Sequence, residues 1–507
     1  PAELAALVRN AMHATREEVQ AKRLQLGLAA AQGHADAQCN LGFMHFDGEG
    51  GPVDFAEARR LCGLAAAQGH AKAQCVLGHM HVNGRGGPVD FAEARRLCGL
   101  AAAQGDDDAR CVLGSMHHRG QGGPVDFAEA RRLFGLAAAQ GHDDAQYNLG
   151  NMHGHGQGGP VDFAEARRLH GLAAVHGHAK AQYMLGDMHR LGKGGPVDLA
   201  EARRLYGLAA AQGQADAEHM LGFMHYIRQG GPVDFAEARR LFGLAAAQGH
   251  AKAQCVLGNM HFDGEGGPRD LAETRRLYGL AAVQGDVKAQ YMLGDMHHTG
   301  KGGPVDFVEA RRLFGLAAAQ GHEKNAQCML GHMHYNGQGG PTDLAEARRL
   351  YGLAAEQGYD DAQCVLGSMH RNGKGGPVDF AEARRLFGLA AEQGHAKAQY
   401  NLGLMHRHGE GGPEDLAEAR RLYGLAAAQG HAAAQEALGL LDRAAEEQLA
   451  KQQAKADAMM AKLLAEDAEE KQAKGAPKTT KKAKGKKVTM SCASAALSSS
   501  APSAAPV

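Results

Sequence analysis

The chain has 507 residues and a net charge of −1, and it combines 71 Gly with no Trp and only 5% aromatic residues. This length exceeds one ordinary core, and so few bulky side chains disfavour a single large globule. The balance of 55 basic and 56 acidic residues excludes a nucleic-acid surface spread over the whole chain. No apolar run approaches the roughly 18 residues of a membrane span, so none is expected in this chain.

One sequence repeat accounts for most of the chain. It opens at Gly33, and near-copies follow every 36 residues, except that one repeat holds an extra residue within 323–325. Self-similarity of this period is typical of solenoids. The predicted organisation is an N-terminal helical cap and half repeat over 1–32, eleven repeats over 33–429, a C-terminal half repeat and capping helix over 430–470, and a basic, then Ser/Ala/Pro-rich, disordered tail over 471–507.

Each repeat predicts two helices, helix A and helix B. In the first repeat, helix A runs from about Ala35 to Phe46, and Gly48 then suits a left-handed cap. Asp54 and Glu57 form a capping-box pattern that begins helix B. The predicted fold is therefore all-α, a right-handed α/α superhelical solenoid of tandem 36-residue helix-turn-helix repeats.

Two glycines recur inside the predicted helices, and one turn breaks the pattern. Gly42 and Gly63 each cost about 1 kcal/mol against Ala, so we expect both to permit close helix contact. Arg228 occupies the slot that is Gly in every other full repeat. Because a non-Gly residue is strained in a left-handed conformation, the turn at Arg228 is predicted to follow a different path or to fray.

The repeat resembles the Sel-1-like repeat family, a relative of the tetratricopeptide repeats. The segments 145–150 (Ala-Gln-Tyr-Asn-Leu-Gly) and 162–166 (Asp-Phe-Ala-Glu-Ala) carry the resemblance, which covers roughly residues 20–440. The family's Tyr after the Leu-Gly step is His here, as at His45, and its aromatic pair in helix B is reduced to one slot. The resemblance implies an adaptor role in assembling protein complexes, as in endoplasmic-reticulum quality control, without naming a partner.

The histidines and cysteines are predicted to be structural. His45 and its equivalents fall on the side of helix A expected to face helix B, and no carboxylate or Cys stands at a fixed spacing to complete a metal site. Cys39 and Cys62 occupy slots that hold aromatic residues in sister repeats, which indicates buried reduced thiols. No repeat departs from its sisters by carrying a catalytic set, so no catalytic, cofactor or metal residue is predicted.

One helix A face varies between repeats, at the slots of Asp36, Asn40, Phe43 and Asp47 in the first repeat. We call this face the variable stripe and expect it to be a solvent-facing groove for protein or peptide partners; the alternative is drift on an unimportant surface. The recurring Arg59-Arg60 pair is predicted to lie on a neutralised solvent face beside Asp54 and Glu57. The predicted partner residues are Phe43, Asp47, His79, Ser115, Asn151, Asp187, Leu191, Phe223, Ile227, Asn259, Asp295, His332, Ser368 and Leu404.

The expected function is a scaffold or adaptor without enzymatic activity, a small-molecule substrate or a cofactor. Eight Lys and no acidic residue lie between Lys471 and Lys487, so contact with nucleic acid or an anionic surface through this tail is one alternative function. A metal-dependent hydrolase is the other. A cytoplasmic location is expected; the tail leaves the nucleus open, and an N-terminus without Met leaves the endoplasmic-reticulum lumen open.

Overall fold

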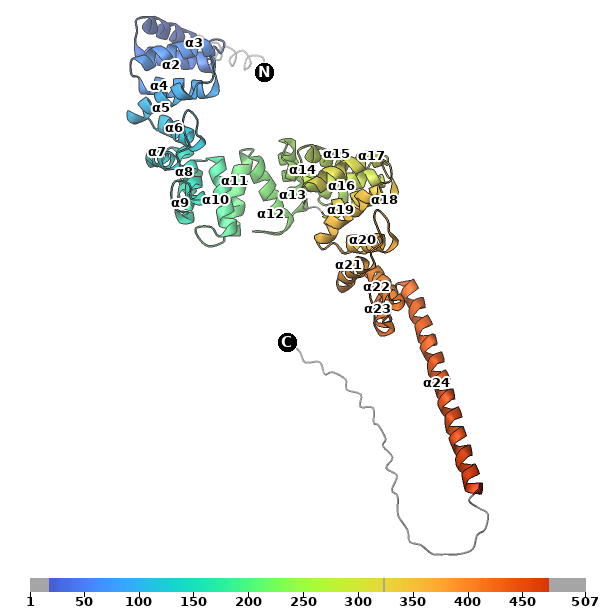
Figure 1. Ribbon diagram of the computed structural model, residues 1–507. Coiled ribbons are helices and arrows are strands. Elements are labelled where there is room, and N and C mark those ends of the chain that lie inside the picture. The colour runs from blue at the N-terminus through green and yellow to red at the C-terminus, as the bar shows by residue number, and fades with distance from the viewer. Residues whose placement is uncertain (1–17, 322–323, 474–507) are drawn as a thin grey trace, which may run out of the picture. The chain divides into compact units, whose positions relative to one another are not determined.

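A computed structural model describes residues 18–321 and 324–473, and within these ranges the regular structure is entirely helical (Figure 1). Helices A and B alternate as predicted, which confirms the all-α helix-pair fold. The A helices are α2 (Ala35–Asp47), α4 (Ala71–Asn83), α6 (Asp107–Arg119), α8 (Asp143–His155), α10 (Ala179–Leu191), α12 (Ala215–Tyr226), α14 (Ala251–Asp263), α16 (Val287–Thr299), α18 (Lys324–Asn336), α20 (Asp360–Asn372) and α22 (Ala396–His408). The B helices are α3 (Phe55–Ala67), α5 (Phe91–Ala103), α7 (Phe127–Ala139), α9 (Phe163–Val175), α11 (Leu199–Ala211), α13 (Phe235–Ala247), α15 (Leu271–Val283), α17 (Phe307–Ala319), α19 (Leu344–Glu356), α21 (Phe380–Glu392) and α23 (Leu416–Ala428).

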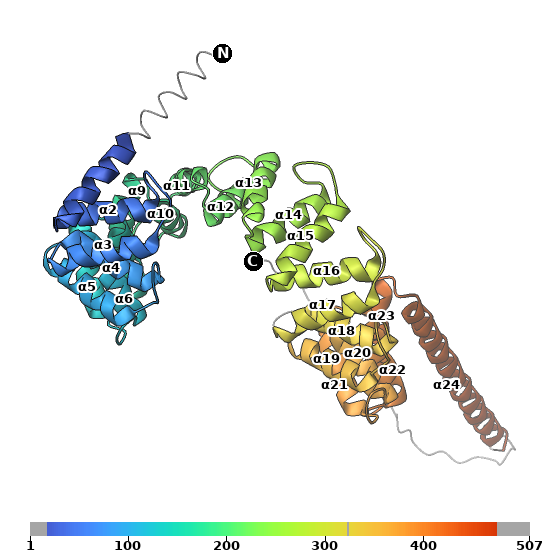
Figure 2. The same cartoon turned by 90° about the horizontal axis from the view of Figure 1, so that it is seen from above.

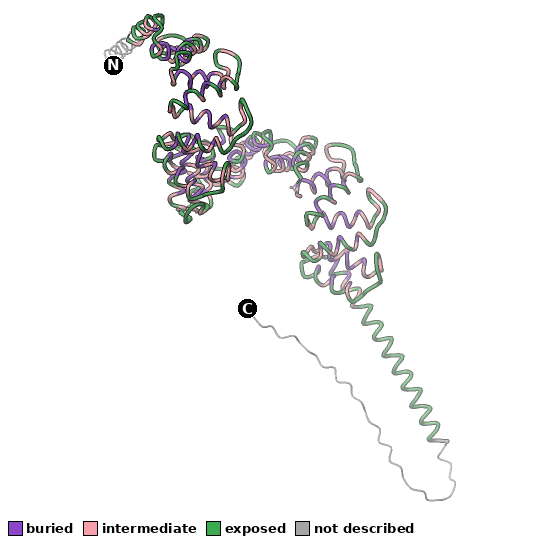
Figure 3. The backbone as a smooth tube through the Cα atoms, turned by 60° about the vertical axis from the view of Figure 1, so that its left-hand side comes forward, coloured by how far each residue is buried: buried purple, intermediate pink, exposed green. Residues whose placement is uncertain are grey.

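The chain divides into two compact units, Pro1–Asp379 and Phe380–Val507, and every contact described below lies within one of them. In the first unit, each helix from α2 to α20 contacts the next along the chain (Figure 2). In the second unit, α21 to α24 contact one another in the same sequential way. Each helix therefore buries its apolar side against its neighbours in sequence, as Figure 3 shows.

The ends of the described chain differ from the repeats. A helix covers residues 18–31, and α24 (Ala432–Ala473) is one long helix whose first turns bury Ala434 and Ala437 while most of the remainder is exposed (Figure 3). None of the helices described has both the length and the apolarity that a bilayer crossing needs. Most of the predicted N-terminal cap and the predicted basic tail lie outside the described residues.

The helix ends follow the predicted chemistry in part. Gly48 adopts φ 75°, and its N–H donates to the carbonyl of Met44, so the left-handed cap is present. The carboxylate of Asp54 accepts the backbone N–H of Glu57 at 3.0 Å. The reciprocal half of the capping box is absent, because the Glu57 carboxylate pairs with Arg60 at 2.6 Å and the Asp54 N–H donates to the His45 carbonyl.

Histidine begins many A helices, a role that the sequence pattern did not indicate. Nδ1 of His70 accepts the backbone N–H of Ala73 at 3.2 Å and satisfies a free donor of the first turn of α4. Nε2 of the same ring lies 3.0 Å from the carboxylate of Asp36, on the preceding A helix. The imidazole thus caps one repeat and binds the previous one, as His142, His178 and His250 do.

The two helical glycines have opposite surroundings. A Cβ on Gly42 would lie 2.7 Å from Sγ of Cys62 and 3.3 Å from the carbonyl oxygen of Ala58, so this glycine does permit close approach of α2 and α3. A Cβ on Gly63 would meet no heavy atom within 4 Å. The prediction of close contact is wrong for Gly63, because the glycine points away from the facing helix.

The glycine pair of the A–B turn lies close to the preceding repeat. Gly86 adopts φ 71°, and a Cβ there would overlap the carbonyl oxygen of Phe55, the first residue of the preceding helix B. A Cβ on Gly87 would lie 2.5 Å from Nη1 of Arg59. The turn of one repeat therefore packs directly on the helix start of the repeat before it, and only glycine fits at Gly86, where the contact is with backbone and φ is positive.

The unusual turn at Arg228 keeps the ordinary path. Arg228 adopts φ 61°, the left-handed conformation that Gly48 has, and it is the one non-Gly residue with positive φ in the described ranges. The turn retains its hydrogen bonds from Gln229 N–H to Met224 and from Asp234 N–H to His225. The turn does not take a different path, because the contacts of Gly230 with the preceding repeat hold it in place while Arg228 takes up the strain. The helix end is altered, since α12 ends one residue earlier than the other A helices, with Ile227 at φ −105°.

Candidate functional site

The variable stripe lies on the side of helix A away from the core. Leu41 and Met44 on the other side are 8% and 3% exposed. Among the predicted partner residues, the exposed ones are Asp47, His79, Leu191, Ile227 and His332. The half-buried ones are Phe43, Ser115, Asn151, Asp187, Phe223, Asn259, Asp295, Ser368 and Leu404. Of these predicted residues, the three that belong to the Asp47 slot (Asp47, Leu191 and Ile227) are exposed, whereas the Phe43 slot holds every half-buried residue together with His79 and His332. The stripe is therefore not uniformly solvent-facing.

Side chains in the Phe43 slot of helix A pack on the helix B slot of Cys62, which holds Cys, His or an aromatic residue in the different repeats. Phe43 packs against the core cluster that contains Cys62, and Phe223 packs against the cluster of Phe242. The expectation of a solvent-facing groove is therefore wrong for Phe43 and Phe223, since each covers a core cluster. Part of the variation in this slot accommodates the helix B residue beneath it.

Polar residues in the same slot are also used internally. The hydroxyl of Tyr206 donates to Asp187 at 2.7 Å, and Asp187 also pairs with Arg190 at 2.8 Å. The hydroxyl of Tyr278 donates to Asn259 at 2.6 Å. These hydrogen bonds occupy Asp187 and Asn259, which leaves them less available to a partner than the sequence indicated.

A pocket of about 520 Å³ opens on the stripe where α6, α8 and α10 meet. It brings together two predicted partner residues, Ser115 and Asn151, with Arg119 and His155 from the Asp47 slot of the stripe. The other predicted residues do not line it. Its full lining is Ser115, His118, Arg119, Phe134, Tyr147, Asn148, Asn151, Met152, His155, Gln157 and Met184, with no Asp or Glu.

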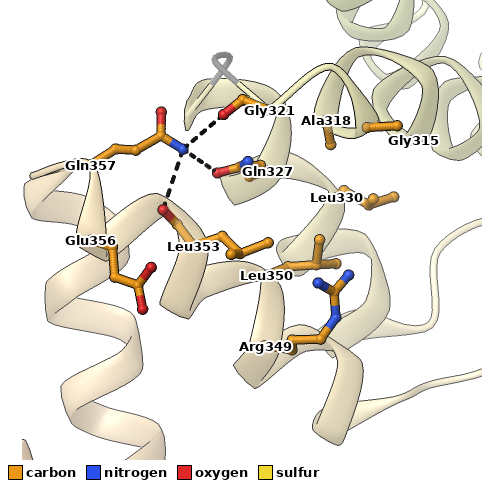
Figure 4. Close-up of a pocket in the computed structure, with 11 residues that line it drawn as sticks. Gly315, Ala318, Gly321, Gln327, Leu330, Arg349, Leu350, Leu353, Glu356 and Gln357 are labelled. Carbon is orange, nitrogen blue, oxygen red and sulfur yellow. Dashed lines mark hydrogen bonds between the residues drawn. The ribbon is translucent and has the colours of Figure 1, made fainter.

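A second pocket, of about 560 Å³, lies among α17, α18 and α19 (Figure 4). The amide of Gln357 donates to Oε1 of Gln327 at 2.8 Å and to the carbonyls of Gly321 and Leu353 at 3.3 Å each. No stripe residue lines this pocket. These hydrogen bonds tie the end of α19 to the start of its own repeat, and the pocket lies where α17 of the preceding repeat meets α18 and α19. It therefore marks the seam between two repeats rather than a place of variation.

The two recurring arginines have different roles, which sequence reasoning missed. Arg60 pairs with Glu57 on the surface as predicted, but Nη2 of Arg59 lies 2.7 Å from Nδ1 of His81 in the next repeat. Its guanidinium also donates to the carbonyls of Arg85 and Pro88. The joint recurrence of His and the first Arg was the available signal, because both lie at fixed positions in every full repeat.

The Arg–His contact explains the recurring histidines. His81 is half-buried, and burial together with the Arg59 guanidinium lowers the pKa of its imidazole. A guanidinium only donates hydrogen bonds, so the ring accepts in its neutral form. Its partner is the preceding helix B, whereas the prediction placed it against helix B of its own repeat. A second cation at the same ring would face like-charge repulsion, which disfavours metal binding there.

The cysteines show no sign of nucleophilic activation. Cys62 and Cys98 are fully buried, and burial raises the pKa of each thiol to about 12. A thiol with so high a pKa carries almost no thiolate at neutral pH. The eight cysteines among the described residues are free, as the packing interpretation predicted.

Stacked two-helix repeats joined by glycine turns define a helical-repeat solenoid. Within that class the chain belongs to the Sel1 repeat family, which confirms the resemblance. Sel1 repeat proteins are in general protein-interaction scaffolds, and their solenoid is typically non-catalytic. The matching Sel1 repeats cover residues 35–70, 71–106, 107–142, 143–178, 179–214, 215–250, 251–286, 287–322, 324–359, 360–395 and 396–431.

One solved structure shows the same architecture over most of this chain. The crystal structure of c5321, a protective antigen of uropathogenic Escherichia coli strains with an SLR fold, is 30% identical to this chain with a TM-score of 0.71, and the match covers 92% of this chain and 99% of that one. A Sel1 repeat protein from Oxalobacter formigenes is also 30% identical over 61% of this chain and 89% of that one, with a TM-score of 0.48. A comparison with curated protein sequences gives no match.

Proposed function

We propose that this chain is a scaffold that binds protein or peptide segments on the variable stripe. The observation that supports the proposal most is the pocket among α6, α8 and α10, where side chains from consecutive repeats converge on the one face that differs between repeats. Copied repeats acquire a specific surface only where their residues differ. The general role of Sel1 repeat proteins agrees with this function.

The exposure of the predicted partner residues changes which of them are the best candidates for apolar anchors. Leu191 and Ile227 are 48% and 39% exposed, so a partner can bury them as apolar anchors. Phe43 and Phe223 present only part of their surface and also support the core. Leu191 and Ile227 therefore replace the two phenylalanines as the first choice for anchors.

The test compares two faces of the full chain. Stable partners are captured from a lysate by cross-linking, first with the unmodified chain and then with a variant carrying Ala at four exposed stripe positions, His79, Arg119, Leu191 and Ile227. A matched variant carries Ala at four exposed helix B positions, Arg96, Arg132, Arg168 and Arg204.

The expected result is loss of specific partners with the stripe variant and retention with the helix B variant. Both variants should melt like the unmodified chain, because exposed substitutions contribute little to folding. The reverse pattern would place recognition on the helix B side and contradict the proposal. Binding through Lys471–Lys487 remains a prediction, since only 471–473 of that segment, the end of α24, are among the described residues.

A further inference from the structure

Three donors converge, without partners, in the pocket among α6, α8 and α10. Ser115 and Arg119 stand one turn apart on α6, and Asn151 faces them from α8. Among the residues that the structure describes, the Ser115 hydroxyl, the Arg119 guanidinium and the Asn151 amide have no side-chain hydrogen bond or ion pair. This sets the pocket apart from the equivalent slots of other repeats, where Asp187 and Asn259 bind tyrosine hydroxyls.

The charge and floor of the pocket define its ligand chemistry. Arg119 is the one cation in the Asp47 slot of the eleven repeats that is charged at every physiological pH, and no Asp or Glu lines the pocket. Carboxylates match a guanidinium flanked by neutral donors. Phe134 and Met152 form a buried apolar floor, which suits the methylene stem of an acidic side chain.

The stripe becomes apolar two and three repeats beyond Arg119, after His155 in the repeat between. Leu191 and Ile227 occupy the same slot as Arg119 and are exposed, while Asp187, one turn before Leu191 on α10, is tied to Tyr206 and Arg190. Packed helices lie roughly 10 Å apart, and an extended chain advances about 3.3 Å per residue. One repeat therefore corresponds to about three residues of an extended partner, so Arg119 lies about six residues from Leu191, and Ile227 lies one repeat further on.

From these contacts we infer that the stripe between α6 and α12 binds an extended peptide segment in which an acidic residue lies about six residues from a bulky apolar residue. The carboxylate binds Arg119, Ser115 and Asn151, and the apolar side chain covers Leu191 and Ile227. This inference rests on the proposed function and specifies the partner of the same surface.

A polyanion such as nucleic acid fits this surface less well than a peptide. Binding a phosphate backbone needs several cations at regular spacing. The stripe offers one arginine at the pocket, and Asp47, Asp263 and Asp295 recur along the same face. A single carboxylate followed by apolar side chains avoids that repulsion.

The probe is a library of random 12-residue peptides, selected first on the full chain and then on Arg119→Ala and Leu191→Ser variants. Arg96→Ala serves as the matched control, because Arg96 is an exposed arginine on helix B. We expect the unmodified chain and the control to enrich peptides with Asp or Glu about six residues from Leu, Ile, Phe or Met, in either chain direction. Arg119→Ala should lose the acidic position and keep the apolar one, and Leu191→Ser should do the opposite.

Affinity measurements then decide the assignment. For an enriched peptide, replacing its acidic residue by the amide should weaken binding to the unmodified chain at least tenfold, and should leave binding to Arg119→Ala unchanged. Enrichment of purely apolar peptides that depend on Leu191 would overturn the carboxylate pocket while the proposed function stands. Peptides that bind independently of the stripe variants, or no enrichment, would overturn both. Tighter, Arg119-dependent binding of a 20-nucleotide single-stranded DNA would overturn the peptide in favour of a polyanion.

Discussion

The seam between repeats and the variable stripe differ in how much their residues vary from repeat to repeat. At the seam, Gly86 lies against the Phe55 carbonyl and Arg59 against His81, and almost the same residues recur in every repeat. On the stripe, the slot of Arg119 changes from repeat to repeat while the backbone stays the same. Backbone contact tolerates one residue type, whereas a side chain at the surface tolerates many. Positions with the same residue in every repeat are therefore those that stack the repeats, and positions that vary are those where one repeat can act differently from another.

Acidification should lower the free energy of unfolding by weakening the Arg–His contacts between the described repeats. Burial and the neighbouring arginine lower the pKa of His81 and its equivalents, so the unfolded chain binds more protons than the folded chain once the pH falls below about 6.5. Stability is therefore full above that pH and is lost as the pH falls through the lowered pKa values. Eleven Arg–His pairs occur in the described residues. The pKa of the imidazole is lowered in ten of them, so these ten act in the same direction.

The measurement is the urea midpoint of the full chain at pH 7.5, 6.5 and 5.5. This range lies above the titration of the surface carboxylates such as Glu57, whose pKa is lowered by Arg60, so those pairs stay intact. The midpoint should change little between pH 7.5 and 6.5 and should fall between pH 6.5 and 5.5, and His81→Gln should reduce that fall. An unchanged midpoint between pH 7.5 and 5.5 would show that the Arg–His contacts do not set stability.

Glycine-to-alanine substitutions should change the free energy of unfolding in opposite directions at the seam between repeats and on the open surface of a helix. Gly86→Ala places a Cβ on the Phe55 carbonyl and in a left-handed conformation, so we expect a loss of about 3 kcal/mol. Gly63→Ala meets no atom and gains helix propensity, so it should stabilise by up to about 1 kcal/mol. Denaturant unfolding of both variants tests the pair, and equal effects would refute the distinction.

Aromatic and aliphatic stripe residues should differ in stability. Phe43→Ala should destabilise by about 2 kcal/mol, because its half-buried ring covers the cluster that contains Cys62. Leu191→Ala should change stability by less than about 0.5 kcal/mol, because its side chain is exposed. Thermal melts of the two variants measure the difference; a stable Phe43→Ala variant would restore the view of a purely solvent-facing stripe.

The smallest expected effect concerns the strained turn. Arg228→Gly should stabilise the chain by about 1 kcal/mol, since glycine adopts φ 61° without steric cost and the turn keeps its hydrogen bonds. The control is Gly192→Arg, the opposite change in the preceding repeat, which should destabilise by a similar amount. A lower melting temperature for Arg228→Gly would indicate that the arginine makes a compensating contact.

The sequence by itself determined the repeat period, the alternation of helices, the left-handed cap at Gly48 and the burial of the cysteines. These features are local or are repeated many times, so pattern and propensity define them within one repeat. The sequence also identified the face on which Ser115 and Asn151 lie, because residues of one helical face share a period. The sequence could not show which residues of this face are half-buried against helix B.

Only the tertiary structure decided how one repeat meets the next. The angle between repeats places Arg59 on His81, Gly86 on the Phe55 carbonyl, and the stripe phenylalanines over the core. The same angle brings Arg119 and Asn151 from different helices into one pocket. A helical wheel describes a single helix and carries no information on that angle, because the angle results from the packing of side chains across the interface.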